Sequence, residues 1–167
     1  MASTLLILRH GIAEDPGPAT GYEDATRALT PEVAARMALA AAGIASLDLG
    51  VEAVVASPLT RCRQTGEIVA DALGLALEQD SRLAPGMDID GVEGLLIEHP
   101  DTQTLMICGH QPDLSRLVAE LTAGGSVEFR KGSLAVLGIE APRRGGGRLL
   151  ALYPPFALRE LGAPGRD

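Results

Sequence analysis

Three short segments dominated by apolar residues constrain the fold of this chain most strongly. They lie at residues 4–9, 51–57 and 104–109. A strand with one buried face alternates apolar and polar residues, whereas a continuous apolar run is typical of a parallel strand covered on both faces. A segment with the pattern of a helix follows each of the three runs. This alternation predicts a mostly parallel sheet with helices on both of its faces.

The helices carry recognisable start signals. Thr30 is a good N-cap residue, Pro31 suits the first helical position, and Gly43 is expected to end this helix. Ser57 and Pro58 are expected to start the next helix by the same device. A third helix is expected directly after the third strand.

Two further strands are expected at 133–140 and 148–155, joined by a glycine-rich turn. They are expected to form an antiparallel edge of the sheet. The predicted fold class is therefore α/β, a three-layer α/β/α sandwich with a mostly parallel sheet. One domain is expected over residues 1–167, with its core at about 4–155 and a frayed tail after it.

Composition excludes several classes of function. The net charge of −8 and the aromatic content of 2% argue against binding to nucleic acid or to an anionic membrane. The sequence has neither an apolar run long enough to span a membrane nor the pattern of a signal peptide, so a cytoplasmic location is expected. Cys62 and Cys108 have no metal-ligand spacing and are expected to be buried thiols. We expect no metal and no cofactor.

Residues of chemical interest follow each of the three buried strands. Arg9, His10 and Gly11 follow the first strand, Arg61 lies shortly after the second, and His110 comes directly after the third. Ligands of such sheets bind outside the carboxyl ends of the strands, so these side chains are expected to converge. Two arginines and two histidines at one edge need a compensating anion, and a phosphoryl group suits them.

The three motifs, "LRHG", "SPLTRCRQT" and "GH", resemble those of the histidine phosphatase superfamily. The short chain and the segment "RLAPGMD" are similar to its SixA-type branch, the phosphohistidine phosphatases, over about residues 4–155. The resemblance implies a phosphoglycerate-mutase-like fold without a cap. It implies that His10 is the nucleophile, that Arg9 and Arg61 hold the phosphate, and that His110 is a second histidine of the pocket. Gly11, within the first motif, is expected to help bind the substrate.

The sequence departs from the family pattern at the general acid. Asp88 and Asp15 are the candidate proton donors, each weighed against a role as a solvated loop charge, and Gly17 stands where many members have asparagine. Imidazole is a better leaving group than an alkoxide, so a missing acid favours phosphohistidine as the substrate.

The expected partner is a phosphorylated protein, such as a phosphotransfer domain in signal transduction, or else a small phosphate ester. The expected activity is that of a metal-independent phosphatase with a phosphohistidine intermediate. A small-molecule phosphomonoesterase and a non-catalytic phosphate-binding module are the alternatives.

Overall fold

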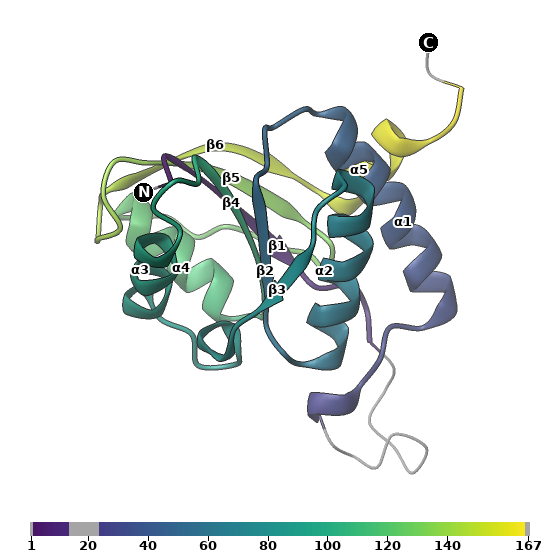
Figure 1. The fold of residues 1–167 in the computed structure, drawn as a ribbon, viewed down its shortest axis with the longest axis horizontal. Helices are drawn as coiled ribbons and strands as arrows, with labels where there is room; N and C mark the ends of the chain where they lie inside the picture. The colour runs from purple at the N-terminus through teal and green to yellow at the C-terminus, as the bar shows by residue number, and fades with distance from the viewer. Residues whose placement is uncertain (1, 14–23, 166–167) are drawn as a thin grey trace.

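The computed structural model describes residues 2–13 and 24–165 (Figure 1). The described residues form a six-stranded sheet in the order β3-β2-β4-β1-β5-β6. The strands are β1 (Thr4–Arg9), β2 (Ala53–Ala56), β3 (Leu77–Gln79), β4 (Thr104–Gly109), β5 (Leu134–Ile139) and β6 (Gly147–Tyr153). The first four strands are parallel, whereas β5 pairs antiparallel with both β1 and β6. This confirms the predicted mixed sheet with an antiparallel edge.

Helices cover the sheet on both faces, as the continuous apolar strands predicted (Figure 1). One face carries three of them and the other face two. The helices are α1 (Pro31–Ser46), α2 (Thr60–Leu73), α3 (Ile89–Glu98), α4 (Asp113–Thr122) and α5 (Pro155–Gly162), with short 3-10 turns η2 (Asp24–Thr26) and η3 (Ser81–Leu83). In the part of the chain that the structure describes, no helix is long and apolar enough to cross a membrane.

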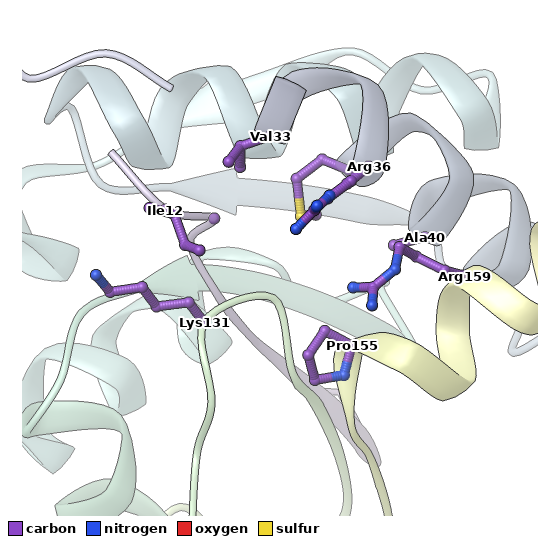
Figure 2. A pocket seen from close by; sticks show the side chains of 9 residues that line it. Ile12, Val33, Arg36, Ala40, Lys131, Pro155 and Arg159 are labelled. Carbon is purple, nitrogen blue, oxygen red and sulfur yellow. The ribbon is translucent and has the colours of Figure 1, made fainter. Parts of the chain in front are cut away.

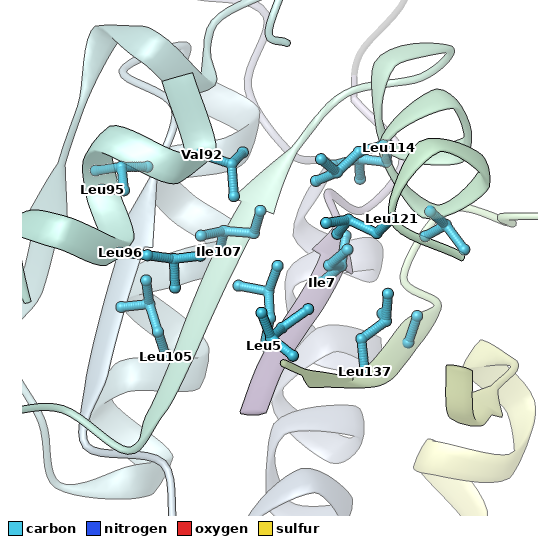
Figure 3. Close-up of a cluster of buried hydrophobic side chains, with 14 of the residues drawn as sticks. Leu5, Ile7, Val92, Leu95, Leu96, Leu105, Ile107, Leu114, Leu121 and Leu137 are labelled. Carbon is cyan, nitrogen blue, oxygen red and sulfur yellow. The ribbon is translucent and has the colours of Figure 1, made fainter. Parts of the chain in front are cut away.

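Strand β1 contributes to both halves of the core. Leu5 and Ile7 pack on the side of α3 and α4, which Figure 3 shows, while Leu6 and Leu8 pack on the side of α1, α2 and α5. All four side chains are completely buried. Burying a leucine or isoleucine side chain contributes roughly 1.5–3 kcal/mol, so β1 is a rigid base for the residues that follow it.

The contact between α1 and α5 corrects two expectations. Helix α1 does not end at Gly43 but continues to Ser46. Gly43 lies at the point where α5 crosses α1, and a Cβ atom there would lie 1.9 Å from the carbonyl oxygen of Leu158. The chain beyond residue 155 is likewise not a frayed tail, because residues 155–162 form α5 and Leu158 is fully buried against α1.

The start of α2 also differs from the prediction. The helix begins at Thr60, and its N-cap residue Leu59 has no side-chain cap. Ser57 instead lies in the turn before it, where its Oγ accepts a hydrogen bond from the Leu59 N–H at 3.3 Å. The prediction was wrong because Ser57 stays in an extended connection that leads from the sheet edge to the helix.

The sheet register brings the ends of three strands together. In the pairing of β1 with β4, Arg9 lies opposite Gly109, and in the pairing of β2 with β4, Ala56 lies opposite Cys108. The residues that follow β1, β2 and β4 therefore meet at one edge of the sheet.

Candidate active site

Two histidines and one arginine form a buried cluster at this edge. His10 follows β1 and His110 follows β4, and their ring centroids are 5.3 Å apart. Arg61, in the first turn of α2, lies against both rings: its Nε is 3.3 Å from His10 Nε2 and its Nη2 is 3.2 Å from His110 Nδ1. The three residues expose only 7%, 3% and 6% of their surface. The structure thus brings together side chains that are separated by up to 100 positions in the sequence.

The hydrogen bonds of His10 define which ring nitrogen carries the proton. Its Nδ1 lies 2.5 Å from the carbonyl oxygen of Gly11. Because a carbonyl oxygen only accepts hydrogen bonds, Nδ1 must be the donor, and in the neutral ring Nε2 then holds the lone pair. Nε2 faces Arg61. The nucleophilic nitrogen of the neutral ring therefore points into the cluster.

The environment keeps His10 neutral. Burial is the largest effect, and with the positive charges of Arg61, His110 and Arg9 it lowers the pKa of His10 to about 3, although the hydrogen bond with Gly11 acts in the opposite direction. The charged ring is disfavoured because it would lose its hydration in a buried place that already holds positive charge. A neutral imidazole is the form that can attack phosphorus.

The segment after His10 is fixed by close packing and by one hydroxyl. A Cβ atom on Gly11 would lie 2.9 Å from Val33 Cγ1, so this position requires glycine for a close approach to α1. The Gly11 N–H donates to Thr65 Oγ1 at 3.1 Å, and the same hydroxyl donates to the Arg61 carbonyl oxygen at 2.7 Å. Thr65 is completely buried. It therefore holds the loop after His10 and the first turn of α2 in one arrangement.

His110 has a defined tautomer in its neutral form. A guanidinium only donates, so Nδ1 of His110 accepts from Arg61 and Nε2 carries the proton. Nε2 lies 2.8 Å from Ser57 Oγ, which accepts this hydrogen bond. Ser57 is completely buried. Its role is to orient His110, which the sequence did not indicate because Ser57 looked like a helix cap.

Arg9 completes the positive edge. Its Nη1 donates to the carbonyl oxygen of Phe129 at 2.6 Å, which fixes the guanidinium at the end of β1. Its buried Nε has no hydrogen-bond partner among the described residues. Burial lowers the pKa of Arg9, but an arginine remains charged at neutral pH. An oxyanion at this edge would give the Nε–H group a partner.

The sequence analysis missed Asp24, which binds Arg61. Arg61 Nη1 donates to the Asp24 carbonyl oxygen at 2.8 Å, and Nη2 donates to Asp24 Oδ2 at 3.0 Å. Burial raises the pKa of Asp24, but the hydrogen bond and charge of Arg61 outweigh it and hold that pKa below its usual value. Asp24 therefore provides a carboxylate beside the arginine. Asp24 also pairs with Arg27 at 3.1 Å, but nothing in the sequence relates Asp24 to Arg61.

Of the two candidate proton donors, the structure describes Asp88, whose carboxylate is engaged outside the cluster. The Asp88 carboxylate caps α3 and accepts a hydrogen bond from the Gly91 N–H at 2.9 Å. Asp15 lies outside the described residues. Within the ranges 2–13 and 24–165, no group of three or more histidine, cysteine or acidic residues is placed to hold a metal ion.

Cys62 is buried, as predicted, but it also touches the cluster. Its Sγ lies 3.4 Å from His110 Nε2 and 3.4 Å from the Gly109 carbonyl oxygen. Burial raises the pKa of Cys62, but hydrogen bonds with Cys108 and His110 outweigh it and lower the pKa to about 6. With no exposed surface, the thiol acts as a packing neighbour of His110.

Comparisons with known proteins agree with this geometry. The model of the histidine phosphatase superfamily (branch 1) matches residues 5–104. An uncharacterized protein from Picosynechococcus sp. is 37% identical over 151 residues, covering 88% of each chain.

Solved structures match nearly the whole chain. The structure of the protein histidine phosphatase SixA complexed with tungstate is 26% identical, with a TM-score of 0.80 over 93% of this chain and 99% of that one. A mycobacterial glucosyl-3-phosphoglycerate phosphatase with inorganic phosphate is 16% identical, with a TM-score of 0.71 over 95% of this chain and 99% of the other. The second likeness is one of fold.

Proposed function

The chain belongs to the histidine phosphatase superfamily, on its SixA-type branch, and from this premise we propose that it removes the phosphoryl group from phosphohistidine on a protein substrate. The family supports phosphatase activity in general. The observation that carries the proposal is the neutral, buried imidazole of His10, whose Nε2 lone pair faces the Arg61 guanidinium at 3.3 Å. A side chain that only bound phosphate would present a donor there and would have no need of a lone pair.

The first step transfers the phosphoryl group to His10. Guanidinium N–H groups of Arg9 and Arg61, with His110 beside them, hold the equatorial oxygens, where transition-state charge is spread. The Nε2 lone pair forms a bond to phosphorus in line with the leaving nitrogen. That nitrogen keeps the electron pair of the broken P–N bond, and a substrate ring with a proton on its other nitrogen departs as neutral imidazole. Nδ1–H and its Gly11 acceptor stabilise the phosphorylated His10 ring.

The second step returns the enzyme to its starting state. A water oxygen attacks phosphorus, the bond from phosphorus to Nε2 breaks, and its electron pair returns to Nε2. One water proton stays on the phosphate product and the other is released to solvent. The two arginines supply the positive charge that this chemistry requires, so we propose that the reaction proceeds without a metal ion.

Asp24 takes part by competing for the same arginine. Its carboxylate occupies Arg61 Nη2 in the free protein, and an arriving phosphoryl oxygen seeks the same N–H groups. We propose that the phosphoryl group displaces this carboxylate when it binds. Its 57% exposed side chain has solvent into which it can move.

The leaving group argues for phosphohistidine. Asp88 is engaged as a helix cap, and the hydrogen bond and charge of Arg61 keep Asp24 ionised, so neither carboxyl group is in the form and place to protonate an alkoxide. An alkoxide is a far stronger base than imidazole and needs such a proton to leave, whereas imidazole does not. A phosphotransfer domain, which presents its phosphohistidine on a surface, is the type of partner that we propose.

The second candidate function is a small-molecule phosphomonoesterase. A similar fold in a glucosyl-3-phosphoglycerate phosphatase favours it. The test is to measure kcat/KM for a phosphohistidine protein, an aryl phosphate and a sugar phosphate. We expect them to rank in that order. A sugar phosphate turned over fastest would overturn the protein substrate, and no turnover of any of the three would favour a phosphate-binding module.

A further inference from the structure

A second feature of the same sheet edge is a cavity of about 120 Å³ that begins one residue beyond His10 (Figure 2). It lies between α1, α5 and the segment before β5. Its apolar wall includes Val33, Met37 and Pro155. Ile12, which is 47% exposed, lies at its rim. The cavity is thus an apolar recess that opens beside the catalytic edge.

Three positive side chains from three separate elements surround this recess. They are Arg36 of α1, Lys131 of the segment before β5, and Arg159 of α5 (Figure 2). Arg36 pairs with Glu32 at 2.6 Å. The side chains of Lys131 and Arg159 form no ion pair or hydrogen bond with the described residues, within 2–13 and 24–165. Lys131 and Arg159 therefore give the recess positive charge that no described residue pairs with.

The backbone links the recess directly to the nucleophile. The Gly132 N–H lies 3.0 Å from the carbonyl oxygen of Arg9 and 3.2 Å from that of His10. Lys131 is consequently held against the end of β1, and Gly11 forms part of the cavity wall. Because Gly11 lines the cavity and follows His10 directly in the chain, the cavity adjoins the proposed phosphoryl site.

We propose that this cavity is a docking subsite for the protein substrate, occupied by one apolar side chain that has carboxylates on either side of it. The proposal rests on the function proposed above. The size of the cavity fits one side chain, because an engineered protein cavity of about 150 Å³ accommodates benzene. Lys131 and Arg159 then pair with the carboxylates of the partner segment at the rim.

The charge of the whole protein makes this local patch selective. With a net charge of −8, most of the surface repels an acidic partner. A positive patch beside His10 attracts that partner at one place and thereby orients its phosphohistidine toward the nucleophile. Charge complementarity therefore identifies the occupant of the cavity as an acidic protein segment.

The test compares two peptides with the same phosphohistidine. One has Glu-Leu-Glu next to it and the other has Gln-Ala-Gln. We expect the wild-type protein to prefer the acidic peptide by about tenfold in kcat/KM, from the buried leucine and the rim charges. The double variant Lys131→Ala with Arg159→Ala should lose, through KM, the part of this preference that the rim charges contribute, and keep the part that comes from the leucine. The matched control Arg143→Ala with Arg144→Ala, in the turn before β6, should keep the whole preference.

Small substrates and direct binding separate the possible failures. Turnover of p-nitrophenyl phosphate should be the same in wild type and both double variants. If the Lys131/Arg159 variant raised the KM for p-nitrophenyl phosphate as much as the KM for the acidic peptide, these two residues would act on the phosphate itself, against the proposal. Binding of the unphosphorylated acidic peptide, measured by fluorescence anisotropy, should weaken in the Lys131/Arg159 variant.

If this binding is found but the phosphohistidine is not hydrolysed, the subsite stands and the proposed function falls. If wild type treats both peptides equally, or if benzoate occupies the cavity in a soaked crystal while the acidic peptide does not bind, the docking subsite is overturned.

Discussion

Arg61 Nε lies 3.3 Å from His10 Nε2, so a guanidinium donates to the very nitrogen that holds the imidazole lone pair. This contact disfavours protonation of the ring. The lone pair stays available for the substrate, because an arriving phosphoryl oxygen offers the guanidinium a stronger, charged acceptor. In the reaction that we propose, both groups act on one phosphorus atom, so the same pair of residues has one contact in the free protein and another in the complex.

The first prediction concerns the nucleophile. His10→Ala should lower phosphatase kcat by roughly 10³-fold or more, because no neighbouring group offers the covalent route. The residue lies beyond the end of β1, so the circular dichroism spectrum should be retained. Steady-state assays with an aryl phosphate give the measurement, and near wild-type turnover would refute the assignment.

The second prediction concerns stability against pH. The pKa of His10 is lowered to about 3 in the folded protein, whereas an unfolded histidine titrates near 6.5. Between these values the unfolded chain binds more protons, so His10 makes the folded state less stable as the pH falls from 6.5 toward 3. Its contribution is at most about 1.4 kcal/mol per pH unit.

His10→Gln should make the dependence of unfolding free energy on pH less steep in this window. Urea titrations at pH 7, 5.5 and 4.5 measure it. Identical slopes for the two proteins would show that the ring is already protonated in the folded state.

The third prediction concerns Asp24. Asp24→Asn removes the negative charge beside Arg61, so tungstate should bind about three- to tenfold more tightly at low salt. Isothermal titration calorimetry measures this affinity. Asp71→Asn, at an exposed position of α2, is the control for net charge and should leave the affinity unchanged. Weaker binding in Asp24→Asn would mean that Asp24 positions Arg61 more than it competes for it.

The fourth prediction concerns the crossing of α1 and α5. Gly43→Ala would place a Cβ atom 1.9 Å from the Leu158 carbonyl oxygen, so α5 must move away. We expect a loss of stability of roughly 1–3 kcal/mol, measured by urea denaturation. Gly124→Ala has no heavy atom within 4 Å of the added Cβ and is the matched control. Equal stability of the two variants would contradict the close packing of this helix pair.

The fifth prediction concerns metal ions. Activity should persist in excess EDTA, because we assign the stabilisation of phosphoryl charge to Arg9 and Arg61. Assays with and without chelator provide the comparison. Turnover that is lost in EDTA and restored by a divalent ion would require a different mechanism.

The sequence predicted the elements that are determined by residues close to one another in the chain. Thr30 caps α1 as expected, with its Oγ1 accepting from the Val33 N–H at 3.2 Å. The continuous apolar runs predicted the parallel strands. Because the carboxyl ends of parallel strands lie at one edge of the sheet, Arg9, His10 and His110 were expected to lie at the same edge.

Features that depend on contacts between residues far apart in the chain could not be predicted from the sequence. Gly43 was predicted to end its helix. A glycine inside α1 is explained by the close approach of α5, which the sequence does not reveal. Asp24 pairs with a residue 37 positions away, and no spacing rule identifies such a contact. Ser57 resembled a helix cap, and its function depends on His110, 53 positions away.

The hydrogen bonds of the Thr65 hydroxyl bear on which properties of this protein can be altered by substitution. It joins the loop after His10 to the first turn of α2, so the proposed nucleophile and the proposed phosphate-binding Arg61 are tied to each other by hydrogen bonds. The recess between α1 and α5 is lined by Gly11, but by none of His10, Arg61 and Thr65. Substrate preference can therefore be altered there by substitution while the chemical step keeps its geometry.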